Sequence, residues 1–330
     1  MTPMQLTYRL YQEQDSPGLL RLWEQETGWG TPRPELRQWL FEGNPYEGTF
    51  IVVAMDESQQ IVGEFIFYAS LISVDGREVR ASRAFAPIVS KVVRDSYRSI
   101  NPFQPISAMY QMGVQVLQER GDELIYMVPN PRWMRFLRMF PGLHCGSFPL
   151  WSLPLPLTDP LLLGDGFTSR PLAAWDERVD RLWQAASRLH GCMAVRDART
   201  LSWKVGNINY DVTAVERGGE MMGLVASRKK GDRQWLIFDL LSADAEDSLR
   251  ATLAAVCNLA HAKWAATDPE ETEFRLRKVA VLVTPVMERA VRSLGFTRDD
   301  YDFPLAINIL DPKIAEQDVM PARWYISAND

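Results

Sequence analysis

The first half of the chain alternates between stretches with the periodicity of strands and stretches with that of helices. Apolar residues recur at every second position in the former and at every third or fourth position in the latter. The helix at 16–26 is expected to begin with Ser16 as its N-cap and Pro17 at its first position. Strands are predicted at 6–12, 50–56, 61–74, 82–93, 123–129 and 146–155, and helices at 16–26, 34–42, 103–120 and 131–140.

A proline-rich stretch, SLPLPLTDPLLLGDG, separates this half from a second half in which the order recurs. The repeated order, in halves of about 160 residues, indicates an internal duplication. We therefore expect an α/β (mixed α+β) fold with two consecutive domains, each a mostly antiparallel mixed sheet flanked by helices. The expected boundaries are 1–155 for the N-terminal domain, 156–166 for the linker and 167–330 for the C-terminal domain. In the second half, strands are predicted at 167–173, 211–218, 221–228, 234–241, 277–285 and 302–310, and helices at 176–190, 245–266 and 286–296.

The composition is that of an ordinary globular protein, with 46% hydrophobic and 24% charged residues among 330. A net charge of −6 argues against a dedicated nucleic-acid binder, because neutralising phosphates requires an excess of Lys and Arg. The N-terminal sequence lacks a basic region followed by an apolar run, and no stretch has 18 uninterrupted apolar residues. We therefore expect a cytoplasmic protein without a signal peptide or a membrane span.

The cysteines and histidines do not form a recognisable motif. Cys145, Cys192 and Cys257 have no paired spacing and are expected to be reduced thiols. The neighbouring His144 and His190 suggest metal binding, but a zinc site needs four convergent ligands. No metal is predicted, and a cysteine nucleophile is not favoured.

The segment VRDSYRSINPF (93–103) is the strongest candidate for an anion site. It is expected to be a loop between a strand and a helix, where backbone N–H groups and the positive end of the helix dipole point at an anion. Arg98 would add a guanidinium suited to a diphosphate. The segment has no glycine, so the alternative is a plain turn whose arginine faces solvent. The residues expected to contact the ligand are Val93, Arg98, Ser99, Ile100, Asn101 and Phe103.

Two polar residues next to apolar segments are candidates for chemistry. Glu64 lies in the strand IVGEFIF, where burial would raise its pKa and make it a candidate general base. Its alternation with Val62 and Ile66 could instead place it on the solvent face. Asn130, in VPNP, either caps the following helix or binds substrate. Asp95 is a second candidate base that also suits a turn.

The order of elements and several motifs resemble the GCN5-related N-acetyltransferase (GNAT) superfamily, and the doubling resembles its tandem members. VVRDSYRSINPF stands where the family has V-x-P-x-Y-R-G-x-G-x-G, the segment that binds the pyrophosphate of coenzyme A. YRLYQEQDSPGLLRLW, WLFEGNPYEGTFIVVAMDESQQIVGEFIF and YMVPNPRWMRFL resemble other landmarks of the first domain, and VRDARTLSWKVGNINYDV, RSLGF and RWYISAND resemble landmarks of the second half.

The resemblance implies an acyltransferase that moves an acyl group, acetyl in the family's usual chemistry, from an acyl-CoA to an amine by direct attack. The donor would lie between the fourth and fifth strands of the first domain, with a backbone N–H of the fourth strand polarising the thioester. Many members protonate the departing thiolate with a Tyr in the next helix, but FLRMF (136–140) has none. Tyr126 is the first substitute, with Tyr97 and Tyr110 as others. The second domain has no comparable loop in DLLSADAEDSLRATL and is expected to bind no cofactor.

Two other functions remain open. Tandem members of the superfamily include transferases that take an amino acid from aminoacyl-tRNA, and the missing glycines would suit a different donor. A non-catalytic protein that binds a small molecule or a partner is the third hypothesis. The expected partners are an acyl-CoA donor and a small-molecule amine acceptor, with tRNA only as an alternative donor and no membrane. A monomer or a homodimer is expected.

Overall fold

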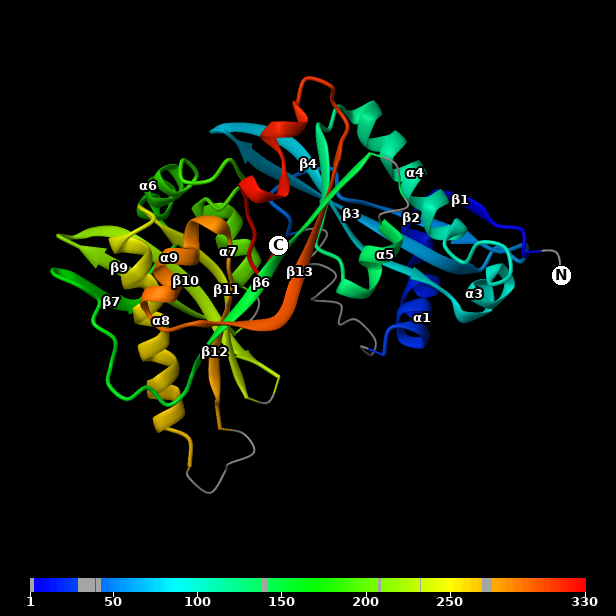
Figure 1. Cartoon of the computed structure of the whole chain (residues 1–330). Coiled ribbons are helices and arrows are strands. Elements are labelled where there is room, and N and C mark those ends of the chain that lie inside the picture. The colour runs from blue at the N-terminus through cyan, green and yellow to red at the C-terminus, as the bar shows by residue number, and fades with distance from the viewer. Residues whose placement is uncertain are drawn as a thin grey trace. The chain divides into compact units, whose positions relative to one another are not determined.

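The computed structural model describes residues 3–28, 39, 43–137, 140, 142–206, 209–231, 233–268 and 275–330. It divides into two compact units, neither of them one continuous segment (Figure 1). Unit 1 comprises Met1–Leu71, Val79–Met127 and Ile307–Ile314, and unit 2 comprises Ile72–Glu78, Val128–Ala306 and Ala315–Asp330. Both combine helices with parallel and antiparallel strands, so the predicted mixed α/β class is confirmed.

Unit 1 is built on a mixed sheet with the strand order β1-β2-β3-β4-β5, and the end of β13 lies beside β5. The β1–β2 and β2–β3 pairs are antiparallel, whereas β4 and β5 are parallel. The elements are β1 (Thr7–Leu10), α1 (Ser16–Glu26), β2 (Phe50–Met55), β3 (Ile61–Val74), β4 (Arg77–Val89), α3 (Lys91–Tyr97), α4 (Gln104–Arg120) and β5 (Leu124–Met127).

Helices cover both faces of this sheet, which follows from the uninterrupted apolar run in β3. Ile66 and Tyr68 pack with Leu19 of α1 on one face. Phe65 and Phe67, at the alternate positions of β3, contact Tyr110 of α4 on the other, with ring centroids 5.8 and 6.2 Å away. A strand that is buried on both faces need not alternate between apolar and polar residues.

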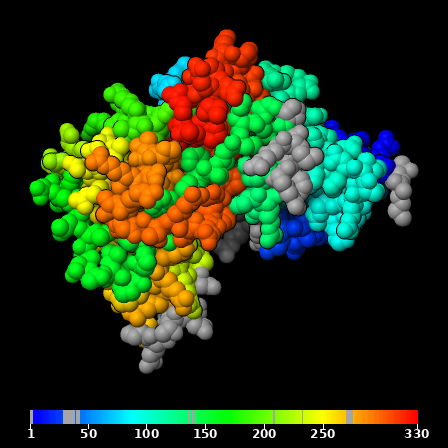
Figure 2. Space-filling view, viewed as in Figure 1, coloured from blue at the N-terminus to red at the C-terminus, as the bar shows by residue number. Residues whose placement is uncertain are grey.

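Unit 2 is built on a second run of strands with the order β13-β6-β12-β11-β10-β9-β7. Helix α8 packs on β9, β10 and β11, and α6 packs on β10 and β11. In Figure 2, α9 (orange) forms part of the surface of this unit. Its exposed residues include Glu288, Arg289 and Arg292. The elements are β6 (Leu143–Pro154), β7 (Phe167–Pro171), α6 (Glu177–Ala186), β8 (Cys192–Ala194), α7 (Ala198–Gly206), β9 (Asp211–Arg217), β10 (Glu220–Lys230), β11 (Gln234–Ser242), α8 (Asp247–Ala265), β12 (Lys278–Leu282), α9 (Glu288–Ser293), β13 (Thr297–Ile309) and β14 (Trp324–Tyr325).

The strand predicted at 82–93 differs most from the structure. β4 ends at Val89, and residues 91–97 form the helix α3, whose N-cap Ser90 accepts a hydrogen bond from the Val93 N–H. The Ser90 signal was present in the sequence, but the apolar pair Val92 and Val93 favoured a strand. Helix α7 and the short strands β8 and β14 were not predicted, and the helix predicted at 34–42 lies almost wholly outside the described residues.

The units also divide the chain differently from the predicted boundaries. Residues 128–155 belong to unit 2, where Leu150–Pro154, the end of β6, pairs with β12. The segment predicted as a linker, 156–166, also lies in unit 2 and is held by α8. There the Leu161 N–H donates to the Asn258 side chain at 2.8 Å, and the Leu157 N–H donates to Nδ1 of His261 at 3.2 Å. Among the described residues, no helix has the length and apolar character needed to cross a membrane.

We expect Gly113→Ala to destabilise unit 1. A Cβ at Gly113 of α4 would collide with the ring of Phe67 on β3. Overpacking of this kind costs about 1–3 kcal/mol, which outweighs the gain of about 1 kcal/mol in helix propensity. Urea unfolding of Gly113→Ala, with the exposed Gln115→Ala on the same helix as a control, measures the effect. A Gly113→Ala protein as stable as the wild type would contradict the packing described here.

Candidate functional site

The strand β4 contains a residue with an unusual backbone conformation. Ala86 has φ of +47°, a left-handed conformation that non-glycine residues seldom adopt inside a strand. Such a residue interrupts the regular ladder and redirects neighbouring backbone N–H and C=O groups. Backbone strain of this kind concentrates at functional sites. Pro87, which has no N–H, follows directly.

The pairing between β4 and β5 ends close to this residue. The parallel register runs from Ala81↔Leu124 to Arg83↔Tyr126, and β4 continues for six more residues to Val89. The backbone groups of β4 on that side are therefore not bonded to β5 beyond Arg83. Ala86 lies three residues past this point.

Glu64 of β3 lies near the same part of β4, on the face covered by α1. Its position follows from the hydrogen bond between the Ser90 N–H and the Val62 carbonyl oxygen, at 2.8 Å, which aligns β3 with the end of β4. The Glu64 side chain is 0% exposed, and neither carboxylate oxygen has a hydrogen-bond partner of good geometry among the described residues. Burial raises the pKa of Glu64 to about 8, and the Trp23 side chain offsets only part of that effect. Of the two orientations left open by the sequence, the structure selects the buried one.

Three further side chains line this face. The ring of Phe85 lies 5.6 Å from that of Tyr68, and the guanidinium of Arg83 lies over Phe85 at 5.3 Å. Burial, together with the Glu64 carboxylate, raises the pKa of Tyr68, whereas Arg83 lowers it. Glu64 and Arg83 therefore both act electrostatically on the Tyr68 hydroxyl. Sequence reasoning missed Tyr68, Arg83 and Phe85. The available signal was alternation along the strands: Tyr68 lies an even number of residues from Glu64 on β3, and Arg83 and Phe85 are two residues apart on the neighbouring strand β4.

The predicted Tyr126 is buried at the end of the β4–β5 pairing. Its register partner is Arg83, and its hydroxyl lies 3.3 Å from Oγ of Ser70. Ser70 is six residues from Glu64 along β3, which corresponds to about 20 Å. Glu64 and Tyr126 thus lie on the same face of the sheet, near opposite ends of it, and the Ala86 region of β4 lies between them.

The predicted Asn130 belongs to unit 2 and caps a short helix. Its side-chain oxygen accepts a hydrogen bond from the Arg132 N–H at 3.0 Å, at the start of the 3₁₀ turn Pro131–Trp133. This is the capping alternative that the sequence left open.

The predicted anion segment is part helix and part turn. Val93 is completely buried in α3, while Arg98, Ser99, Ile100 and Asn101 are exposed and Phe103 is half-buried. The turn uses several of its own N–H groups: that of Phe103 donates to the Asn101 side chain at 3.1 Å, and that of Gln104 to the Asn101 carbonyl at 3.0 Å. Pro102 has no N–H to offer. Coenzyme A binding by these residues stays a prediction.

Comparison with known proteins identifies the fold. No family model matches the sequence, and no curated protein sequence matches it. Two solved structures described as GCN5-related N-acetyltransferases, from Kribbella flavida and Anabaena variabilis, each align with 93% of this chain at 14% identity, with TM-scores of 0.64 and 0.66. A probable N-acyltransferase from Enterococcus faecalis aligns with 93% at 12% identity and a TM-score of 0.66. The chain has the GNAT fold. It spans 72% to 73% of the length of these three structures.

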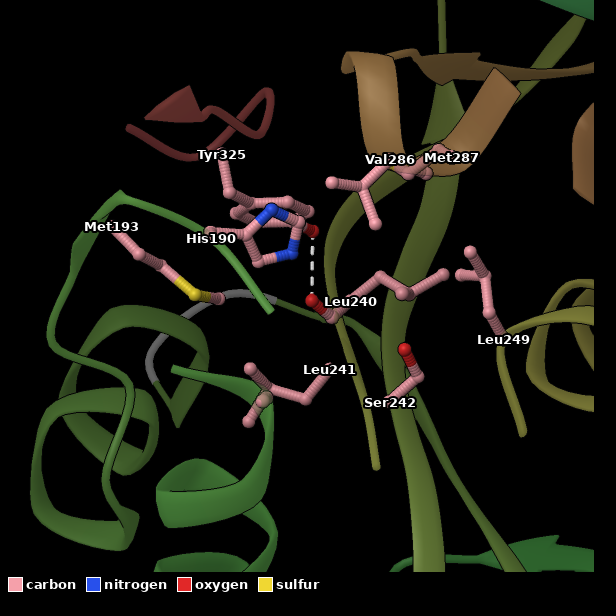
Figure 3. A pocket seen from close by; sticks show the side chains of 10 residues that line it. His190, Met193, Leu240, Leu241, Ser242, Leu249, Val286, Met287 and Tyr325 are labelled. Carbon is pink, nitrogen blue, oxygen red and sulfur yellow. Dashed lines mark hydrogen bonds between the residues drawn. The ribbon is translucent and has the colours of Figure 1, made fainter. Parts of the chain in front are cut away.

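In this GNAT fold, unit 2 repeats the separation of two parallel strands. β11 and β12 pair only from Gln234↔Lys278 to Leu236↔Ala280. Beyond that point the Tyr325 hydroxyl donates to the Leu240 carbonyl oxygen at 2.7 Å, and the ring of His190 lies 4.9 Å from that of Tyr325 (Figure 3). The cavity left beside them is about 10 Å³, which holds one water molecule at most. The chain itself thus fills this gap.

A buried ionic cluster holds Tyr325 and the residues after it in unit 2. Arg196, which is 0% exposed, donates to Asp239 at 2.7 Å and to Asp330, and its guanidinium lies 4.8 Å from the ring centroid of Tyr325. Lys204 also pairs with Asp330, at 2.9 Å. Burial alone would raise the pKa of Asp330, but Arg196 and Lys204 outweigh it and hold that pKa well below its usual range.

We expect Glu64→Gln to stabilise the protein at neutral and alkaline pH. The folded-state pKa is raised from 4.5 to about 8, so the stability that the protonated carboxyl permits is fully present below pH 4.5 and is lost as the pH rises to about 8. The difference amounts to at most about 5 kcal/mol. Thermal melting of both proteins from pH 4 to 9 should show a falling Tm for the wild type and a flatter profile for Glu64→Gln. Parallel profiles would mean that Glu64 is ionised and solvated.

Replacing Arg196 should destabilise unit 2 strongly. Arg196→Met leaves Asp239 and Asp330 buried without their shared cation, which costs about 3–5 kcal/mol. The loss should be smaller at pH 5 than at pH 7, because the abandoned carboxylates then bind protons. Urea unfolding at both pH values measures this, with the exposed Arg199→Met as a control. An unchanged unfolding midpoint for Arg196→Met would show that the cluster contributes no net stability.

Proposed function

We propose that the protein is an N-acyltransferase that moves an acyl group from an acyl-CoA thioester to an amine, with the reaction taking place in unit 1. The observation that carries this proposal is the buried Glu64 carboxyl beside the irregular Ala86 of β4. A carboxyl group with a pKa of about 8, without a hydrogen-bond partner among the described residues, is suited to proton transfer near neutral pH. The GNAT fold of the solved structures supports the same class of reaction.

The proposed reaction needs the amine in its neutral form. Ionised Glu64 accepts a proton from the ammonium group, and the freed amine attacks the thioester carbonyl carbon. A backbone N–H of β4 near Ala86, where the strand has left its ladder with β5, stabilises the negative charge that develops on the carbonyl oxygen. The C–N bond forms as the C–S bond breaks, the thiolate of coenzyme A leaves, and the attacking nitrogen releases its surplus proton to solvent.

Tyr126, the phenol at the point where β4 and β5 separate, lies on the same face as Glu64 but about 20 Å along the sheet from it, too far for both to act on one thioester. The departing thiolate therefore takes its proton from solvent. Arg98, exposed in the turn before α4, is our candidate for contacting the pyrophosphate of the donor. In this proposal Glu64 is the base, the donor lies where β4 and β5 separate, and Arg98, before α4, contacts the pyrophosphate.

Loss of Glu64 should abolish turnover while leaving donor binding intact. With acetyl-CoA and a panel of amines, thiol release measured with a disulfide dye should fall about 10²–10⁴-fold in kcat for Glu64→Gln. The exposed Glu57→Gln, in the turn after β2, is the matched control. Activity retained by Glu64→Gln would remove the residue from the mechanism. No thiol release by the wild type with any amine would count against acyl transfer from acetyl-CoA.

The anion contact can be tested without an acceptor. We expect Arg98→Ala to weaken acetyl-CoA binding about tenfold or more in isothermal titration, because a charge-assisted pair to the diphosphate is lost. The exposed Arg21→Ala on α1 should bind like the wild type. Equal binding by the Arg98→Ala protein would mean that residues 98–103 form only a turn.

A further inference from the structure

Arg83 has no counter-ion in the part of the chain that the structure describes. Its Nε is buried without a hydrogen-bond partner among the described residues, and its guanidinium lies over the ring of Phe85. Its neighbour on the same strand behaves differently: Arg80 is 53% exposed and pairs with Asp122 at 3.6 Å. A partly buried guanidinium without an anion is costly to keep, and it is a ready partner for a carboxylate.

Glu64 is a comparable buried group on the same face, and its charge when ionised is opposite to that of Arg83. Both of its oxygens are buried without a hydrogen bond of good geometry in the described residues, the Trp23 side chain offsets only part of the effect of burial on its pKa, and it lies on the same face of the sheet as Arg83. Both groups act on the pKa of the Tyr68 hydroxyl: Glu64 raises it and Arg83 lowers it. Because Glu64 and Tyr68 are four residues apart on β3, their Cα atoms are about 13 Å apart.

Glu64 and Arg83 do not pair with each other, although one is an acid and the other a base. A pair of that kind would satisfy both groups and would leave neither for a ligand. A molecule with an ammonium group and a carboxylate satisfies both at once: the ammonium faces Glu64 and the carboxylate faces Arg83. The rings of Phe85 and Tyr68 lie on the same face of the sheet and offer apolar contact to the remainder of the bound molecule.

We infer that the acceptor is an amino acid or a close relative, whose carboxylate binds Arg83 while its amine faces Glu64. This inference rests on the proposed function and narrows it from amines in general to amines that carry a carboxylate. Arg83 is here a binding residue for the acceptor, and it takes no part in the proton transfers.

The test compares amino acids with their decarboxylated counterparts. The pairs are phenylalanine and phenethylamine, tryptophan and tryptamine, lysine and cadaverine, and histidine and histamine. With acetyl-CoA as donor, the wild type should have a kcat/KM at least tenfold higher for one or more of the amino acids than for its partner. Arg83→Gln should remove this preference by raising KM for the amino acid about 30-fold, while the decarboxylated amine changes less than twofold. Arg80→Gln, on the same strand, is the matched control.

A second measurement does not need turnover. Isothermal titration with the same eight compounds, without donor, should detect binding of the amino acid to the wild type and to Arg80→Gln, and its loss in Arg83→Gln. Arg83-dependent binding without any thiol release would uphold the ligand class and overturn acyl transfer. Thiol release that is equal for both members of every pair would uphold acyl transfer and overturn this inference. Neither binding nor release with any compound would overturn both.

Discussion

In each unit, two neighbouring parallel strands hydrogen-bond for three residues and then separate, and both sites described above depend on that limit. Backbone N–H and C=O groups beyond the last pair need other partners, because a buried peptide group without one is costly. In unit 2 the chain supplies the partner itself, through the hydroxyl of Tyr325 on the carbonyl of Leu240. In unit 1 the same separation lies beside Ala86, Arg83 and Tyr126, which is where we place a substrate.

The two arrangements differ in their effect on the stability of the folded protein. The gap in unit 2 is closed by a buried cluster of charges that neutralise one another around Arg196. The face in unit 1 instead combines a buried carboxyl, an arginine without a counter-ion among the described residues and a left-handed alanine, each of which costs free energy in the absence of a ligand. The aromatic packing of Phe65, Phe67 and their neighbours against α4 offsets such costs. Function and stability thus oppose each other within one sheet.

Much of the architecture could be predicted from local patterns. α1 and β3 have the predicted bounds, Ser16–Glu26 and Ile61–Val74, because a proline near the helix start and a long apolar run are strong local signals, although Asp15 rather than Ser16 is the N-cap. The GNAT resemblance, drawn from motifs in order, is confirmed by the fold. Prediction was weaker where the outcome depends on contacts between distant residues. Whether Glu64 is buried is decided by α1, which covers its face of β3, and the role of Tyr325 is decided by its contacts with Leu240 of β11 and with His190. No local pattern encodes either.

The path of β13 has a consequence for how the protein is made. Its residues up to Ala306 belong to unit 2, while Ile307–Ile314 belong to unit 1, where the N–H groups of Leu310 and Asp311 donate to the Glu123 carbonyl oxygen. The sheet of unit 1 therefore lacks its last strand until residues 307–314 have been synthesised. Until then β5 presents an open edge, the kind of surface at which nascent chains pair wrongly with one another. Unit 1, although it begins the sequence, is completed on the ribosome only after most of unit 2 has emerged.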